Sequence, residues 1–214
     1  RFSEYKHQIN ESLNGTQHFT GWNKDIIEPL LQHYGIKTHW IDIVDNIWVA
    51  LWFALHKTSS TIADGREYIH MFENDDDEYG YVLLIGCDAQ DNNPYQAGVY
   101  KSNSTIMVDL RKAVPSFFLR PHAQHALMLR KRSSKYEDFM DYTDRIIGIA
   151  KIRVKDGLKW IGQTGLLSVQ SLFPPPYYDT GYANLLNEYK KPSNNQINTV
   201  DYIKLFGSIQ DISH

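Results

Sequence analysis

Cysteine is almost absent from this sequence: Cys87 is the only one among 214 residues, so no internal disulfide can form. A single thiol is typical of proteins in a reducing compartment. The sequence also lacks any run near the roughly 18 apolar residues that a membrane-spanning helix requires. Its first residues lack the apolar segment of a signal peptide. Together these absences predict a cytoplasmic protein that does not engage a membrane.

An excess of positive charge is absent as well. The chain has 22 lysines and arginines against 25 aspartates and glutamates, so no overall basic field attracts nucleic acid. Its 42% hydrophobic and 22% charged residues are close to soluble globular averages. We expect one domain over residues 1–214, with residues 190–214 loosely attached. The first residue is Arg1 rather than methionine, so we expect the chain to start partway into its gene product.

Two helices are predicted in the first quarter of the chain. Apolar residues recur at helical spacing over residues 24–34, with Asn23 as N-cap and Gly35 as the stop. Residues 45–57 are apolar on every side, which is typical of a helix buried within a domain. Asp42 and Asp45 compete as the N-cap of this second helix. Cys87 ends another apolar run, so we expect a buried thiol.

The middle of the chain changes to short strand-like runs separated by turn residues. These runs are residues 67–73, 81–87, 104–109, 126–131 and 145–153. Residues 154–189 appear helical with a break at 172–176, and residues 199–206 form a last amphipathic segment. Helices before and after a block of strands predict an α+β fold, with mixed or antiparallel sheets flanked by N- and C-terminal helices.

Polar residues are concentrated in residues 32–42, the short connection between the two apolar helices. Such groups are partly buried and must be hydrogen-bonded. One interpretation is structural: Thr38 closes a turn, His33 donates to a carbonyl and Asp42 caps the next helix. The other is a ligand site at a helix N-terminus, where backbone N–H groups attract an anion. The residue types alone leave both interpretations open.

Three segments resemble the FRG domain family. The first and most specific contains Gln32, His33, Tyr34, Gly35, Thr38, Asp42, Asn46 and residues 50–54, similar to the family's Gln-His-x-Gly-x-Pro-Thr signature, its aspartate and its Ala-Leu-x-Phe-Ala helix end. Residues 120–129 are similar to its Arg-x-x-x-Gln-x-Gly-x-Phe segment, which implies that Arg120 and Gln124 lie on a strand. Residues 167–174 are similar to its Leu-Phe-Pro element. The resemblance spans about residues 25 to 186.

The chain also departs from the family pattern. His39 stands where arginine is usual after the threonine, and an imidazole is shorter than a guanidinium and not always charged. The Phe-Arg-Gly motif that names the family does not occur in the 214 residues. We therefore expect an FRG-like domain without its most N-terminal strand.

The resemblance implies a nucleotide-like ligand, with NAD as substrate and no metal. The family's motif plan is similar to that of ADP-ribosyltransferases, which implies ADP-ribose transfer or NAD hydrolysis in a toxin or defence role. Catalysis would fall to Gln124, facing the reacting ribose, and to His33. The remaining ligand contacts would come from Gln32, Tyr34, Thr38, His39, Trp40, Asp42 and Arg120, with Tyr34 or Trp40 stacking on a ring and Arg120 meeting a phosphate.

Other functions stay open on the sequence alone. A non-catalytic module that senses a ligand or a partner is favoured by His39 and by the missing motif. The basic run Arg130, Lys131 and Arg132 offers contacts to an RNA backbone, and a protein or an RNA is a possible acceptor. His122 and His125 are three residues apart, but no third metal ligand accompanies them. The oligomeric state is not predicted.

Overall fold

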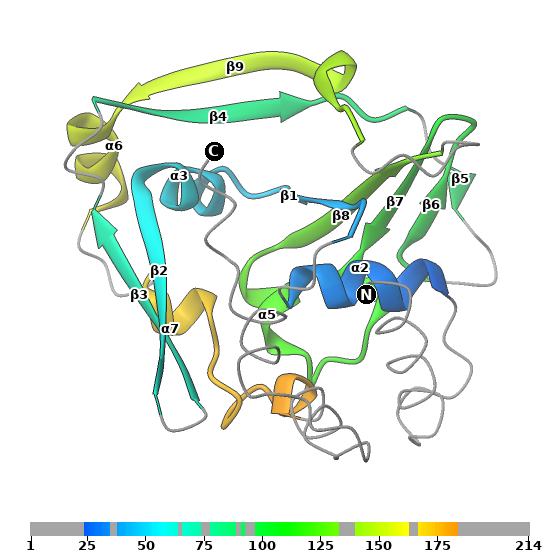
Figure 1. Ribbon diagram of the computed structural model, residues 1–214. Coiled ribbons are helices and arrows are strands. Elements are labelled where there is room, and N and C mark those ends of the chain that lie inside the picture. Colours follow the sequence, from blue (N-terminus) through cyan, green and yellow to red (C-terminus); the bar gives the residue numbers. More distant parts are fainter. Residues whose placement is uncertain are drawn as a thin grey trace.

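The computed structural model describes residues 24–34, 38–63, 66–73, 78–88, 91–92, 97–132, 140–162 and 167–183. Helix α2 (Lys24–His33) lies on one face of an antiparallel sheet (Figure 1). The sheet consists of β1 (Ile41–Val44), β8 (Ala126–Lys131), β7 (Thr105–Asp109), β6 (Val99–Lys101) and β5 (Asp91–Asn92), in that spatial order. Every neighbouring pair in it is antiparallel.

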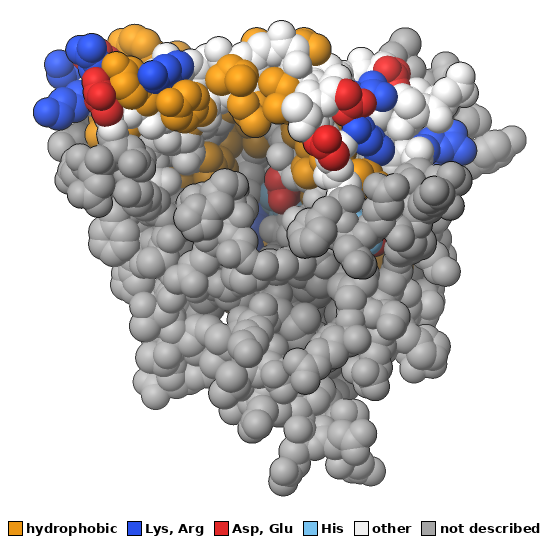
Figure 2. Space-filling model, turned by 45° about the horizontal axis from the view of Figure 1, so that its top comes forward, with side chains coloured by type: hydrophobic (Ala, Val, Ile, Leu, Met, Phe, Trp, Pro, Cys, Tyr) orange, Lys and Arg blue, Asp and Glu red, His pale blue; other side chains and the backbone are white. Residues whose placement is uncertain are grey.

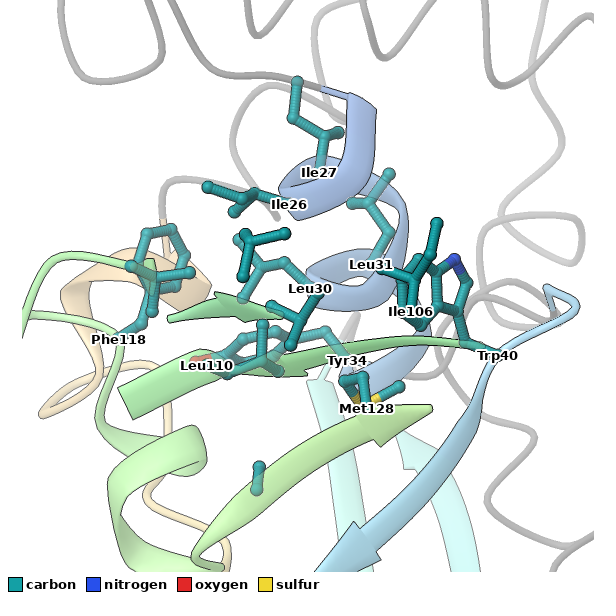
Figure 3. Close-up of a cluster of buried hydrophobic side chains, with 14 of the residues drawn as sticks. Ile26, Ile27, Leu30, Leu31, Tyr34, Trp40, Ile106, Leu110, Phe118 and Met128 are labelled. Atoms are coloured by element: carbon teal, nitrogen blue, oxygen red, sulfur yellow. The ribbon is translucent and has the colours of Figure 1, made fainter. Parts of the chain in front are cut away.

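The first hydrophobic core lies between α2 and this sheet. Side chains of α2 point onto β7 and β8, with Leu30 and Tyr34 fully buried (Figure 3). The predicted helix over residues 24–34 is confirmed, because its apolar residues recur at the helical period and so share one face. The proposed N-cap Asn23 and stop Gly35 lie outside the described residues.

A second core surrounds helix α3 (Ile47–Leu55). Strands β4 (Tyr79–Ile85) and β9 (Ile146–Arg153) form an antiparallel ribbon over α3, and α6 (Val154–Ile161) and α7 (Val169–Leu172) pack beside it. Glycine is required where α6 crosses α3, because a Cβ on Gly157 would lie 2.6 Å from Leu55 Cδ1.

A separate hairpin and three short helical elements complete the described structure. Strands β2 (His56–Ala63) and β3 (Arg66–Glu73) form a separate antiparallel hairpin. Helices α4 (Leu110–Ala113) and α5 (Leu119–Ala123) connect β7 to β8, and the 3-10 turn η1 (Thr143–Arg145) precedes β9. Helices and antiparallel sheets together confirm the α+β class. Among the described residues, no helix has the length and apolar character to cross a membrane.

Most predicted strands are found, but several local predictions are wrong. All five predicted runs overlap observed strands, although Gly86, Cys87, Ser104 and Arg145 fall outside them. Cys87 is exposed rather than buried, because β4 ends at Ile85 and the chain has left the core by residue 87.

Helix α3 also differs from its prediction. It covers Ile47–Leu55 rather than residues 45–57, and neither Asp42 nor Asp45 caps it. The N-cap is Asn46, whose Oδ1 accepts hydrogen bonds from the backbone N–H groups of Trp48 and Val49. The helix is not buried on every side, since Ile47 and Trp48 at its first turn are half exposed.

The C-terminal helical prediction holds only in part. Within residues 154–183 the structure has α6, α7 and a final turn over residues 180–183, with residues 173–179 between the last two. The predicted break at residues 172–176 is thus found. The amphipathic segment predicted over residues 199–206 and the attachment of residues 190–214 lie outside the described residues.

Candidate functional site

A histidine–aspartate pair joins the end of α2 to strand β1. His33 Nδ1 lies 2.9 Å from Asp42 Oδ1, and because a carboxylate only accepts, the imidazole donates from Nδ1. The His33 side chain is only 4% exposed, whereas that of Asp42 is 34% exposed. His33 Nε2 is buried and has no hydrogen-bond partner among the described residues. A buried imidazole nitrogen with a free lone pair can accept a proton or a ligand N–H.

Gln32 and Thr38 hold the two ends of the connection that leads from α2 to β1. Gln32 Oε1 accepts hydrogen bonds from the Thr38 backbone N–H at 2.5 Å and from Thr38 Oγ1 at 2.8 Å. The Thr38 hydroxyl oxygen in turn accepts from the Trp40 backbone N–H at 3.1 Å. These bonds fix where β1 begins, and they place Asp42 in line with His33.

Tyr34 is fully buried in a polar and aromatic cluster. Its hydroxyl donates to Asp179 Oδ2 at 2.6 Å, and its ring lies 4.8 Å from the Arg120 guanidinium carbon. The Tyr182 ring covers the same guanidinium at 4.6 Å, and its centroid lies 5.0 Å from that of Tyr34. Burial and the adjacent Asp179 carboxylate raise the pKa of Tyr34 far above its usual value.

Asp179 is the residue on which this cluster converges. It is fully buried, and besides the Tyr34 hydroxyl it accepts hydrogen bonds from the backbone N–H groups of Arg120 and Tyr182. It therefore caps α5 and the turn over residues 180–183 at the same time. Arg120 is 3% exposed, and its Nε has no partner among the described residues. The sequence analysis missed Asp179, although an aspartate just before a short helix is a recognisable N-cap signal.

Gln124 lies at the C-cap of α5, not on a strand as the sequence suggested. The short segment 119–123 is helical because Asp179 caps it and because Pro121 is tolerated in the first turn. Gln124 is buried, and its Nε2 donates to the Leu172 carbonyl at 2.8 Å. Among the described residues, no hydrogen bond or ion pair joins Gln124 to His33 or to Asp42. The two residues are connected through neighbours: the Gln124 backbone N–H donates to the Arg120 carbonyl, the Arg120 guanidinium lies over the Tyr34 ring, and that ring lies 6.0 Å from the His33 ring.

His39 and Trp40 lie at the entry to β1. The Tyr142 hydroxyl donates to the His39 carbonyl at 2.7 Å, which ties this entry to the segment before η1. Trp40 is 2% exposed, with the Arg130 guanidinium carbon 5.0 Å from its ring. Trp40 thus packs inside the protein, while the His39 side chain is partly exposed.

A second polar network, not predicted from the sequence, lies at the other end of β1. Arg111 Nη1 and Nη2 donate to the two carboxylate oxygens of Asp45 at 2.9 and 2.7 Å, and its Nε donates to Asp109 at 2.9 Å. These carboxylates, Asp109 first, raise the pKa of Arg111 further above its already high value. Although partial burial works to raise it, hydrogen bonds from Arg111 hold the pKa of Asp45 below its usual value.

His125 belongs to this network through both of its ring nitrogens. Asn46 Oδ1 accepts from the N–H groups of α3, and Asn46 Nδ2 lies 3.3 Å from His125 Nε2. His125 Nδ1 lies 3.3 Å from Asp45 Oδ1 and 3.2 Å from Arg111 Nη1, a contact in which the guanidinium can only donate. His125 also has a positive φ of 52°, unusual for a residue with a side chain.

The predicted basic cluster is engaged within the protein. Arg130 Nη1 donates to Glu28 Oε2 at 3.4 Å, Lys131 pairs with Asp144, and Arg132 Nη1 donates to the Ser102 carbonyl at 2.9 Å. Among the described residues, no group of three or more histidine, cysteine, aspartate or glutamate side chains is placed to hold a metal ion. Among the predicted site residues, His33 is the one that combines burial, a hydrogen bond to a carboxylate and a ring nitrogen without a partner in the described part of the chain.

The molecule is hollowed beneath the β4–β9 ribbon. Figure 2 shows hydrophobic side chains along the rim and charged side chains deeper inside. Leu84 points to the inner side of the ribbon, opposite Gly148, yet it is 51% exposed. The ribbon therefore extends beyond the core on α3 and α6, toward the side of the molecule where β1 lies (Figure 1).

Comparison with known proteins gives one match. The family model of the FRG domain matches residues 1–62, which include His33, Thr38, Asp42 and Asn46. No curated protein and no solved structure matches the chain. The second and third motifs, at residues 120–129 and 167–174, lie outside the matched residues. Over residues 1–62 the chain is thus similar to the FRG domain family, which confirms the resemblance indicated by its first motif.

Proposed function

We propose that the chain binds a nucleotide-like small molecule, with NAD as the first candidate, at the end of α2 where His33 meets Asp42. The observation that carries the proposal is the buried Nε2 of His33, which has no hydrogen-bond partner among the residues that the structure describes, on an imidazole whose other nitrogen donates to Asp42. A carboxylate at Nδ1 fixes the ring tautomer and stabilises the imidazolium that forms when Nε2 takes a proton. This is the arrangement of a general base.

The reaction that fits this base is cleavage of the bond between nicotinamide and ribose. The C1′–N1 bond breaks, nicotinamide leaves as a neutral molecule, and the ribose carbon develops positive charge. An oxygen nucleophile, either water or an acceptor hydroxyl, forms the new bond at C1′ and gives its proton to His33 Nε2. With water the products are ADP-ribose and nicotinamide, and with an acceptor the ADP-ribose is transferred.

The other proposed residues fall into two groups according to the contacts that they make within the protein. In the first group a polar group already forms a hydrogen bond within the protein; this group contains Gln32, Thr38, Tyr34 and Gln124. We assign them to positioning the end of α2 and the start of α5. His39 and Asp42, with partly exposed side chains, are the ones that can add direct contacts to a bound nucleotide.

A non-catalytic recognition module is the second candidate, and one observation favours it. Arg120 and Tyr34 are buried against each other and against Tyr182, so a phosphate reaching Arg120 would have to displace an aromatic ring. A site that uses only His33, His39 and Asp42 offers few groups to stabilise a transition state.

The deciding experiment is to incubate the full-length protein with NAD and to measure nicotinamide release alongside binding by calorimetry. The matched variants are His33→Asn, which retains a donor toward Asp42 but lacks Nε2, and His125→Asn, which changes the other histidine–aspartate pair. Release that is lost in His33→Asn and retained in His125→Asn supports catalysis. Binding without release supports the recognition module, and the absence of both overturns a nucleotide site.

A further inference from the structure

The outer face of the β4–β9 ribbon is apolar and exposed. Tyr81, Leu83, Ile147 and Ile149 alternate with inward-facing residues, and between 48% and 74% of each is exposed. Leu83 lies directly opposite Ile149 in the antiparallel register, so the side chains of the two strands form one surface. Figure 2 shows this surface as a row of hydrophobic side chains along the molecule.

Folding of the chain does not require the outer face of the ribbon to be apolar. The inner face of the ribbon already packs on α3 and α6, and among the described strands β4 and β9 pair only with each other. The four outer side chains expose on the order of 400–500 Å² of apolar area, the size at which a contiguous patch marks an interaction site. Antiparallel ribbons with one solvated face normally carry polar residues there.

The two ends of the face carry opposite charges. Lys151 and Arg153 continue the outward-facing row of β9 beyond Ile149, and both are exposed. At the other end, Asp144 and Asp141 are exposed just before β9 begins. Asp144 pairs with Lys131 and, at 3.6 Å, with Arg145 Nε, but its side chain is 59% exposed against 22% and 18% for the two cations, so the carboxylate is the more exposed charge at this end. The face is thus apolar in the middle, basic at one end and acidic at the other.

We propose that this face is the interface of a homodimer, with a second copy of the chain packed ribbon on ribbon. A two-fold axis that lies between the ribbons and runs perpendicular to the strands stacks the apolar centres of the two copies. It also brings the Lys151 end of each copy over the Asp144 end of its partner. An isologous interface requires this kind of self-complementarity.

The area supports a dimer of moderate stability. Two apolar patches of this size, with the charged ends as a rim, approach the roughly 1,600 Å² of a standard interface. Face-to-face sheets pack about 10 Å apart, so the branched side chains of Ile147 and Ile149 can interdigitate with those of the second copy. A single-sign partner, such as an anionic surface, would be repelled by the acidic end.

Sedimentation velocity and light scattering on the full chain, from low to high micromolar concentration, test the proposal. We expect a concentration-dependent dimer whose dissociation constant rises at least about tenfold in Ile149→Asp and less in Ile149→Thr, which retains the β-branched shape. Trp160→Gln is the matched control, because Trp160 is also 61% exposed but lies on α6 outside the face. Thermal unfolding of each variant checks that it folds.

Charge reversal tests the orientation of the two copies. Lys151→Glu and Asp144→Lys should each weaken the dimer, and the double variant should recover most of the loss because opposite charges meet again. A monomer at every concentration overturns the proposal and leaves the face to a different protein. A dimer that is unaffected by Ile149→Asp also overturns it, because another surface would then join the copies.

Discussion

Strand β1 has a histidine–aspartate pair at each end, and the two pairs differ in how their imidazoles are used. At the first end, His33 is buried and donates to Asp42 from Nδ1, and its Nε2 has no hydrogen-bond partner in the part of the chain that the structure describes. At the second end, His125 is 40% exposed and both of its nitrogens face partners, Asn46 on one side and Asp45 on the other. The same two residue types therefore form a potential base in one place and a structural tie in the other.

The difference arises from what surrounds each pair. Arg111 neutralises Asp45 with two hydrogen bonds, so His125 adds little to a network that is already saturated. Asp42 has no such cation among its recorded partners in the described structure, and His33 is its hydrogen-bond donor. Burial and a free acceptor, rather than the presence of a His–Asp pair, thus distinguish a candidate reactive site.

The largest effect is predicted for Asp179, whose carboxylate holds Tyr34 next to His33 of the first pair. Asp179→Ala removes the acceptor shared by the Tyr34 hydroxyl and by the N–H groups of Arg120 and Tyr182. Because each buried donor left without its acceptor costs about 1–3 kcal/mol, we expect the free energy of unfolding to fall by about 3–5 kcal/mol, measured by urea denaturation. Asp179→Asn, which retains an acceptor oxygen, should lose less, and equal losses in both variants would contradict the shared-acceptor role.

The next prediction sets the two histidines against each other. If NAD cleavage is detected, His33→Asn should lower its rate about 100-fold or more, because the proton acceptor is lost. His125→Asn should change the rate less than about threefold, and asparagine tolerates the positive φ at that position. Melting temperatures of both variants show whether folding is retained. Parallel losses of activity and stability in His33→Asn would make His33 merely structural.

Local patterns were enough to predict much of the fold, and the failures have identifiable causes. Helix α2 and strands β3, β4, β7, β8 and β9 have clear apolar periods. Strand β5 has two residues and β6 has three, too few to show a period. Segment 119–123 was misassigned because a five-residue helix has no period either, and what makes it helical is Asp179, 59 residues away along the chain from Arg120.

In the candidate site, too, hydrogen bonding among residues close in sequence could be anticipated, whereas contacts between distant residues could not. The concentration of polar residues between Gln32 and Asp42 predicted hydrogen-bonded side chains in this segment, but it did not predict that His33 pairs with Asp42. The hydrogen bond from Tyr34 to Asp179 joins residues 145 positions apart, and no local sequence pattern predicts it. The network of Arg111 with Asp45 was missed for the same reason, since the two are 66 positions apart.

A smaller effect is predicted at alkaline pH, at the entry to the first end of β1. Burial raises the pKa of Tyr142 to about 12, and its hydroxyl donates to the His39 and Leu129 carbonyls. The unfolded chain loses this proton near pH 10. The contribution to stability is therefore complete below pH 10 and is lost as the pH rises from about 10 to 12.

This contribution is about 1–2 kcal/mol once solvent screening of a partly exposed ring is allowed for. It is measured as the difference in unfolding free energy between the protein and Tyr142→Phe across that range. The buried Tyr34 titrates in the unfolded state of both chains and cancels in the difference. If the difference in unfolding free energy between the two chains does not narrow as the pH rises, the Tyr142 hydroxyl is not kept neutral in the folded state.

The smallest effect is expected at the second end of β1, where the charges are exposed. Asp45→Asn removes the negative charge and one of the two oxygens that accept from Arg111. We expect a loss of about 0.5–1 kcal/mol at neutral pH because exposed ion pairs contribute little. Since the pKa of Asp45 is lowered in the folded state, this contribution is present above about pH 4 and fades as the pH falls below it. Added salt should reduce it as well. The loss of stability in Asp42→Asn, measured in parallel, should not depend on salt because its partner His33 is buried. If salt reduces the losses in the two variants equally, the two ends of β1 do not differ in their electrostatics.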